Sequence, residues 1–162
     1  EQCPWATTGR THHRTPNIIT SLELDPAEME KRNIHLQKKY AEIEENEVRF
    51  EELHCEDAEY LIVAFGSCAR IAQKAMEMAR EEGIKVGLLR PITLWPFPSK
   101  AIAARAAQVK GILTVELNAG QMVEDVRLAV ECKVPVEHFG RLGGIVPDPD
   151  EVITALKEKL IK

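Results

Sequence analysis

From residue 59 onward, apolar residues alternate between short continuous runs and stretches with helical spacing. The short runs are rich in β-branched and aromatic residues and predict strands at 60–65, 85–89, 112–117 and 134–139. The intervening stretches predict helices at 69–82, 99–110, 121–132 and 148–160. Alternating strands and helices predict an α/β domain, in which a mostly parallel open sheet has helices on both faces.

The segment 23–58 has a different pattern. Asp25 followed by Pro26 is a typical helix start, because Asp caps free amides and Pro fits the first helical position. Apolar residues then recur near a period of 3.6, at Met29, Leu36, Tyr40, Ile43, Phe50 and Leu53. The pattern predicts one long, acidic, amphipathic helix.

Residues 1–22 are rich in Pro, Thr and His and show no regular apolar spacing. We expect an extended arm there. The first residue is Glu1 instead of Met, which suggests a chain cut from a longer protein.

Composition excludes several classes of protein. Apolar runs span about five residues, whereas a membrane helix needs roughly 20, so no membrane segment is expected. A net charge of −5 disfavours nucleic acid as a partner. The four cysteines lack the close spacing of zinc or iron-sulfur sites, and no secretory signal precedes them, so we expect reduced thiols in the cytoplasm.

Ligands of parallel sheets bind where strands end, so the strand-to-helix turns are the places to look for chemistry. The first turn contains Gly66, Ser67 and Cys68. Three interpretations are open: an ordinary turn with Ser67 as helix cap, a phosphate site at the helix start, or a reactive thiol with a lowered pKa at Cys68.

The second turn, 88–98, combines three prolines with Trp95 and Phe97. A stiff loop with exposed aromatic side chains favours contact with another protein, because little entropy is lost on binding. The alternative is that both rings fold back over the sheet edge. Arg90 could form a structural pair with a carboxylate at the next strand end, such as Glu116, or could hold a substrate, and the structural pair is favoured.

The third turn, 115–121, carries Glu116, Asn118 and Gln121, which could bind a ligand or another subunit, or could simply form the turn. The histidines show no spacing typical of a metal site or a catalytic constellation. The sequence therefore predicts no catalytic, cofactor-binding or metal-binding residue.

Three motifs carry a family resemblance. YLIVAFGSCA at 60–69, GLLRPITLWPFP at 87–98 and VELNAGQM at 115–122 resemble the C-terminal domain of the alpha subunit of 2-oxoacid:ferredoxin oxidoreductases. The run 22–29 and the helix after it are most similar to the branched-chain type, which uses 2-ketoisovalerate (3-methyl-2-oxobutanoate).

The resemblance implies that residues 59–162 form a transketolase C-terminal-like domain. It also implies a complex that converts a 2-oxoacid and CoA to acyl-CoA, CO2 and reduced ferredoxin. Thiamine diphosphate, Mg and iron-sulfur clusters are expected on other subunits or domains, because the motifs that bind them do not occur here, and the fragment alone is expected to be inactive.

Under this interpretation the strand-end residues shape a cleft or contact other subunits, in a homo-oligomer or hetero-oligomer. The interface candidates are Arg90, Trp95, Phe97, Glu116, Asn118 and Gln121. The alternative is a free-standing module that binds phosphate or CoA at the helix start formed by Gly66, Ser67 and Cys68.

Overall fold

The computed structural model describes residues 22–161, and the expected arm at 1–22 therefore lies almost wholly outside the described residues. The chain divides into two units, residues 1–40 and 41–162, and each is described by itself. None of the helices within 22–161 combines the length and the apolar character that crossing a bilayer requires.

The first described element is helix α1, Pro26–Asn46. Asp25 caps it as predicted, since its carboxylate accepts hydrogen bonds from the amides of Ala27 at 2.8 Å and Glu28 at 3.2 Å. None of its residues is buried within the described structure.

The prediction of a single helix over 23–58 is wrong in its second half. The helix ends at Asn46, whose side-chain amide donates to the carbonyl of Glu42. Strand β1, Phe50–Leu53, follows and pairs antiparallel with β3, Val86–Pro91. Phe50 and Leu53 fit a helical spacing, but the outer edge of β3 has backbone N–H and C=O groups that need hydrogen-bond partners. Pairing with β3 satisfies these groups, and it determines the structure of this segment in place of the local pattern.

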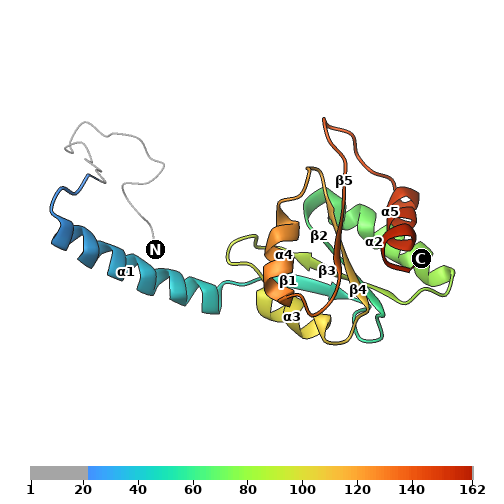
Figure 1. Cartoon of the computed structure of the whole chain (residues 1–162), viewed down its shortest axis with the longest axis horizontal. Helices are drawn as coiled ribbons and strands as arrows, with labels where there is room; N and C mark the ends of the chain where they lie inside the picture. Colours follow the sequence, from blue (N-terminus) through green and yellow to red (C-terminus); the bar gives the residue numbers. More distant parts are fainter. Residues whose placement is uncertain (1–21, 162) are drawn as a thin grey trace, which may run out of the picture. The chain divides into compact units, whose positions relative to one another are not determined.

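The α/β fold with a mostly parallel sheet is confirmed (Figure 1). The sheet has five strands in the order β1-β3-β2-β4-β5, and only the β1–β3 pair is antiparallel. The other strands are β2 Tyr60–Ala64, β4 Gly111–Glu116 and β5 Val136–Gly140.

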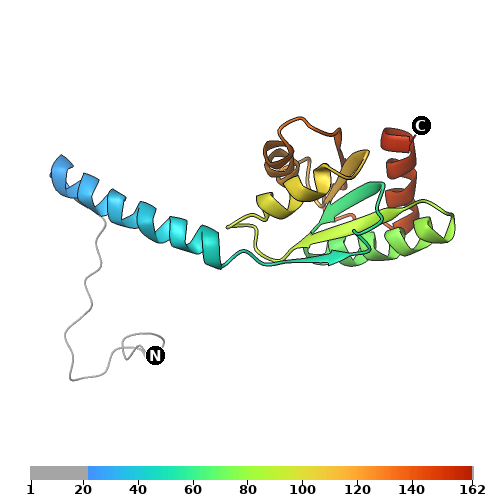
Figure 2. The same cartoon turned by 90° about the horizontal axis from the view of Figure 1, so that it is seen from below.

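Helices cover both faces of the sheet, and each face has its own core (Figures 1 and 2). One face is covered by α2, Gly66–Glu81, and α5, Pro149–Leu156, which a short π-helix, Lys157–Ile161, extends. The other face is covered by α3, Ser99–Ala106, and α4, Met122–Val130.

Strand β2 shows why the strands are continuous apolar runs. Ile62 and Ala64 point into the core beneath α2 and α5, while Leu61 and Val63 point into the core beneath α3 and α4. A strand buried on both faces needs apolar residues at every position. The turns after β2, β3, β4 and β5 all lie at one edge of the sheet, which is called the carboxyl edge below.

Candidate functional site

The carboxylate of Glu116, the last residue of β4, is the centre of the third turn. Its side chain is wholly buried. One oxygen, Oε2, accepts hydrogen bonds from the amides of Met122 at 2.8 Å and Gln121 at 3.2 Å, and Oε1 accepts from the amide of Val123 at 3.1 Å. Glu116 thus caps α4 from the preceding strand, where the free amides and the helix dipole stabilise a negative charge.

Asn118 joins Glu116 to the rest of the turn. Its side-chain amide donates to Oε2 of Glu116 at 3.1 Å, and its side-chain oxygen accepts from the amide of Gly120 at 2.7 Å. Gly120 has a φ of +113°, a conformation that favours glycine. The turn is therefore held at one end by the buried carboxylate of Glu116 and at the other by the hydrogen bond between Asn118 and Gly120.

His138 on β5 completes this network, and sequence reasoning missed it. Its Nδ1 lies 3.1 Å from the hydroxyl of Thr114 and 3.4 Å from Oε1 of Glu116, while its Nε2 lies 3.3 Å from the carbonyl of Asn118. The pairing of β4 with β5 is the signal that could have identified it. In this parallel pair His138 lies opposite Thr114, and Thr114 is two residues before Glu116 on β4.

Arg90 does not pair with Glu116. It lies on β3 directly opposite Glu51 on β1, and the two side chains form an ion pair at 2.9 Å. The sequence placed Glu51 in a helix, so this cross-strand pair could not be anticipated. Arg90 therefore supports the added edge strand, away from the Glu116 network.

Trp95 and Phe97 have different positions on the same loop. Phe97 is half-buried against the core beneath α3 and α4, as one prediction held, whereas 55% of Trp95 is exposed. Thr93 braces the loop, since its hydroxyl donates to the carbonyl of Pro96 at 2.8 Å and accepts from the amide of Arg49 at 3.0 Å. Both rings line a groove of about 760 Å³.

The start of α2 leaves Gly66 and Ser67 exposed and Cys68 buried. Neither Ser67 nor any other side chain of the helix start caps it, because its N-cap position is Phe65. Burial raises the pKa of Cys68, and the charge of Glu116 adds to that effect. The hypothesis of a reactive thiol with a lowered pKa is therefore wrong, while phosphate binding at this helix start stays a prediction.

The described residues do not fit a metal ion or an iron-sulfur cluster. Within 22–161 no three His, Cys, Asp or Glu side chains come together in a way that could hold a metal. Cys55 is buried, and its pKa is raised to about 11, whereas Cys132 is exposed on the opposite edge of the sheet. Among residues 22–161 the one wholly buried carboxylate is that of Glu116, and it accepts hydrogen bonds from helix amides.

Comparison with known proteins shows what kind of domain this is. Residues 58–152 match the family described as pyruvate:ferredoxin oxidoreductase core domain II. The chain belongs to this family. Among curated proteins it is similar to ketoisovalerate oxidoreductase subunit VorB from Methanothermobacter marburgensis, with 45% identity, and from Methanothermobacter thermautotrophicus, with 47% identity.

Both alignments cover 95% of the chain but 43% of the relative, so the chain spans less than half the length of these proteins. A solved structure of 2-oxoglutarate:ferredoxin oxidoreductase from Magnetococcus marinus matches with a TM-score of 0.72 and 26% identity, over 84% of this chain and 24% of that one. A split-gene transketolase matches in fold, with a TM-score of 0.60. These findings confirm the family resemblance and the transketolase-like fold.

Proposed function

We propose that the chain is the C-terminal part of a 2-oxoacid:ferredoxin oxidoreductase subunit whose complex uses 2-ketoisovalerate. The observation that supports 2-ketoisovalerate as the substrate is the difference in sequence identity between two groups of relatives. Identity reaches 45–47% over 95% of the chain with ketoisovalerate oxidoreductase subunits, but 31–35% with 2-oxoglutarate synthase subunits.

The proposed reaction converts 2-ketoisovalerate, CoA and oxidised ferredoxin to acyl-CoA, CO2 and reduced ferredoxin. Thiamine diphosphate, when bound by the complex, stabilises the carbanion that decarboxylation leaves. Within 22–161 no three His, Cys, Asp or Glu side chains come together to hold a metal, which supports placing Mg and the clusters, together with thiamine diphosphate, on other parts of the complex. Ferredoxin is then a partner of the complex as a whole.

The role proposed for this chain is assembly and shaping of a cleft. Gln121 and Trp95 are exposed at the carboxyl edge and are suited to direct contact with a neighbouring chain. Glu116 and Asn118 act through the backbone, because they fix the turn that presents Gln121. Arg90 and Phe97 hold the edge strand and the second loop in place.

The test is turnover with and without the rest of the complex. The chain alone, given 2-ketoisovalerate, CoA, thiamine diphosphate, Mg²⁺ and a viologen dye, should reduce no dye. The complete complex should reduce it, with a higher kcat/KM for 2-ketoisovalerate than for 2-oxoglutarate or pyruvate. Dye reduction by the chain alone would refute the noncatalytic role, and a preference for 2-oxoglutarate would refute the substrate.

A further inference from the structure

A groove with mostly apolar walls lies where β1 begins and where the loop after β3 leads into α3. Its volume of about 760 Å³ is typical of protein binding sites. Both walls belong to residues 41–162, because one comes from the segment 44–50 and the other from 95–101. The apolar lining is made chiefly by Val48, Phe50, Trp95, Pro96, Phe97 and Pro98.

Backbone hydrogen bonds join the two walls of this groove. The amides of Ile92 and Thr93 donate to the carbonyl of Arg49 at 2.9 and 3.1 Å, and the amide of Arg49 donates to the hydroxyl of Thr93 at 3.0 Å. The same hydroxyl donates to the carbonyl of Pro96 at 2.8 Å. The groove is therefore preformed, and a preformed site loses little entropy on binding.

Two aromatic side chains of the groove are open to solvent. The exposed fraction is 55% for Trp95 and 39% for Phe50, while Phe97 is half-buried beside them. Exposed aromatic rings in a groove are typical anchor points of protein contacts, and the face of an aromatic ring also attracts a cation.

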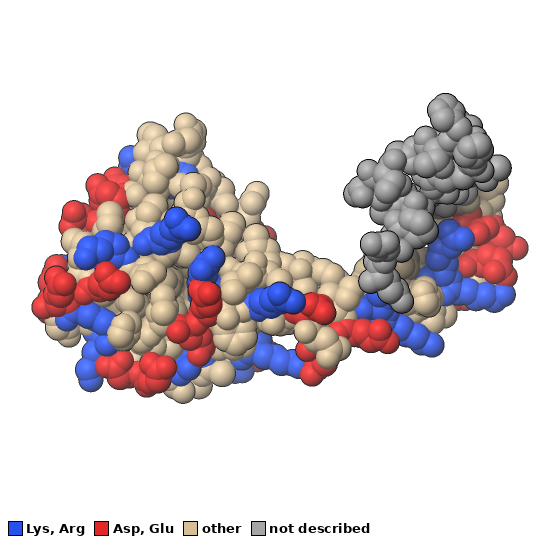
Figure 3. All heavy atoms as spheres, turned by 180° about the vertical axis from the view of Figure 1, so that it is seen from behind, with Lys and Arg blue, Asp and Glu red and all other residues tan. Residues whose placement is uncertain are grey.

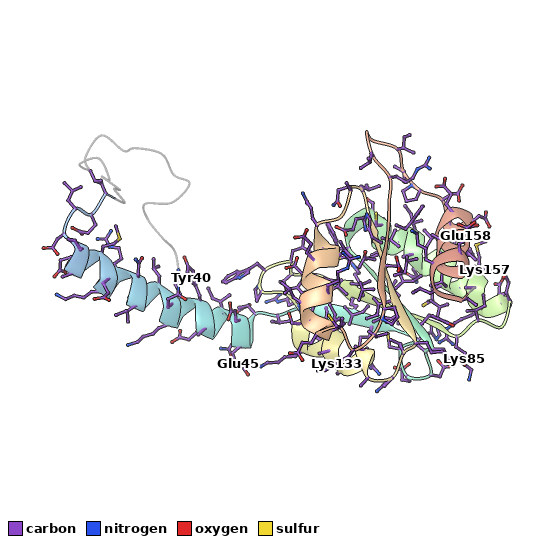
Figure 4. The ribbon with its side chains drawn as sticks, in the orientation of Figure 1. Tyr40, Glu45, Lys85, Lys133, Lys157 and Glu158 are labelled. Atoms are coloured by element: carbon purple, nitrogen blue, oxygen red, sulfur yellow. The ribbon has the colours of Figure 1, made fainter. Side chains whose placement is uncertain are left out.

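The wall formed by the end of α1 is acidic. The segment 41–49 holds four Glu and one Arg, a net charge of −3. Figure 4 shows Glu45 on the last turn of α1, and this residue pairs with Lys100 of the opposite wall at 3.0 Å. Such pairing is common on the surface, where several acidic groups, drawn in red in Figure 3, have basic groups in blue beside them.

Glu44 differs from its neighbour Glu45. Its side chain lines the groove, but it forms no ion pair or side-chain hydrogen bond with another of the residues 22–161. A carboxylate without a partner beside apolar walls favours an occupant that carries a positive charge. The same charge disfavours a second copy of this chain, since a twofold axis would bring two acidic walls together.

We propose that this groove binds a segment of another chain of the oxidoreductase complex, one that presents an arginine next to apolar side chains. A guanidinium fits both features of the groove, because it pairs with a carboxylate such as Glu44 through two hydrogen bonds and stacks on an aromatic ring such as Trp95. A lysine ammonium would supply the charge but lacks the planar face. The inference rests on the proposed assembly role and names the chemistry of the partner.

Fluorescence polarisation of a labelled peptide tests the proposal on the complete chain. The probe is fluorescein-Gly-Leu-Pro-Leu-Pro-Arg-amide, in which the prolines keep the peptide extended. It should bind about tenfold or more tightly than the same peptide with Glu in place of Arg. Glu44→Gln should weaken binding by about threefold to tenfold, and Trp95→Ala by about tenfold or more.

Two matched controls lie outside the groove, on α4. Glu124→Gln removes the charge of another exposed acid, and Leu128→Ala shortens another exposed apolar side chain. Both should leave the affinity for the peptide unchanged, and circular dichroism checks that every variant keeps its fold. Lack of saturable binding at millimolar peptide overturns the proposal. Equal binding of the Arg and Glu peptides, or equal losses in groove and control variants, also overturns it.

The complete complex tests whether the partner is one of its own chains. Glu44→Arg should weaken the hold on this chain, so that gel filtration separates it from the complex, whereas Glu124→Arg should keep it bound. Full retention of Glu44→Arg overturns the inference. If that complex also oxidises 2-ketoisovalerate as the wild type does, the proposed function stands while the groove proposal falls, so the two fail separately.

Discussion

Glu116 shows how a residue that the sequence offers as a ligand-binding or interface candidate can be structural in the fold. A carboxylate at the end of a parallel strand lies where active-site groups of such folds are found. The structure buries it and supplies it with amides from α4, the side chain of Asn118 and the ring of His138. Its charge stabilises the helix start, and its carboxylate is not exposed to solvent.

Replacing Glu116 with Gln should lower the free energy of unfolding by about 1–3 kcal/mol, because a charge-assisted cap becomes a neutral one. Urea denaturation followed by circular dichroism measures this. Glu124→Gln is the control, since Glu124 is an exposed acid in the first turn of α4 and should cost at most about 0.5 kcal/mol. Equal effects of the two substitutions would contradict the capping role.

The described cysteines should differ sharply in reactivity. Cys132 is exposed, whereas Cys55 and Cys68 are buried with raised pKa values, so less of their thiol is ionised near neutral pH. Iodoacetamide labelling of the native chain, read by peptide mass spectrometry, should modify Cys132 first. Cys55 and Cys68 should react only after urea unfolds the chain. Rapid native labelling of Cys68 would revive the thiol hypothesis.

At the scale of elements, the edge strand β1 is fastened to α3 by an ion pair. The guanidinium of Arg105 binds both carboxylate oxygens of Glu52, at 2.9 and 2.6 Å, and each side chain is less than a quarter exposed. Hydrogen bonding from Arg105 lowers the pKa of Glu52 from its ordinary 4.5. This pair joins a segment that the sequence pattern assigned to a helix to α3.

Glu52→Gln should destabilise the chain by about 1–2 kcal/mol at neutral pH. Because the pKa of Glu52 is lowered in the folded state, its contribution is complete above pH 4.5 and is lost as the pH falls through the lowered value. The wild type and the variant should therefore converge in stability only in acid, below pH 4.5. Thermal melts across this range measure the difference.

The control for that experiment is Glu51→Gln. Glu51 lies on the same strand as Glu52 and pairs with Arg90 on β3, but the side chains of Glu51 and Arg90 are both more than 40% exposed. Exposed pairs contribute little, so the cost should stay below about 1 kcal/mol. A larger loss from Glu51→Gln than from Glu52→Gln would mean that the cross-strand pair, and not the pair with α3, holds β1.

At the scale of the whole molecule, residues 41–162 form a unit with two cores on either side of one sheet, while α1 buries none of its residues. The helix predicted from this apolar spacing is present as far as Asn46. Its extension to Phe50 and Leu53 was wrong, because those residues satisfy the open edge of β3.

A chain that begins at Ala41 should fold by itself. Because α1 contributes no buried side chain, removal of residues 1–40 should change the free energy of unfolding of the α/β unit by less than about 1 kcal/mol. Differential scanning calorimetry of the shortened and the complete chain compares them. Loss of the cooperative transition in the shortened chain would show that α1 is part of the folding unit.

The sequence by itself determined the alternation of strands and helices, the parallel sheet and the family, because buried strands and helix starts leave strong local patterns and three motifs occur in order. The sequence also located the candidate turns, because each of them follows the end of a predicted strand. Tertiary structure decided which side chains meet: His138 with Glu116, Arg90 with Glu51, and Arg105 with Glu52. Such contacts join residues far apart in the chain, and strand order and register, which local patterns do not encode, bring them together.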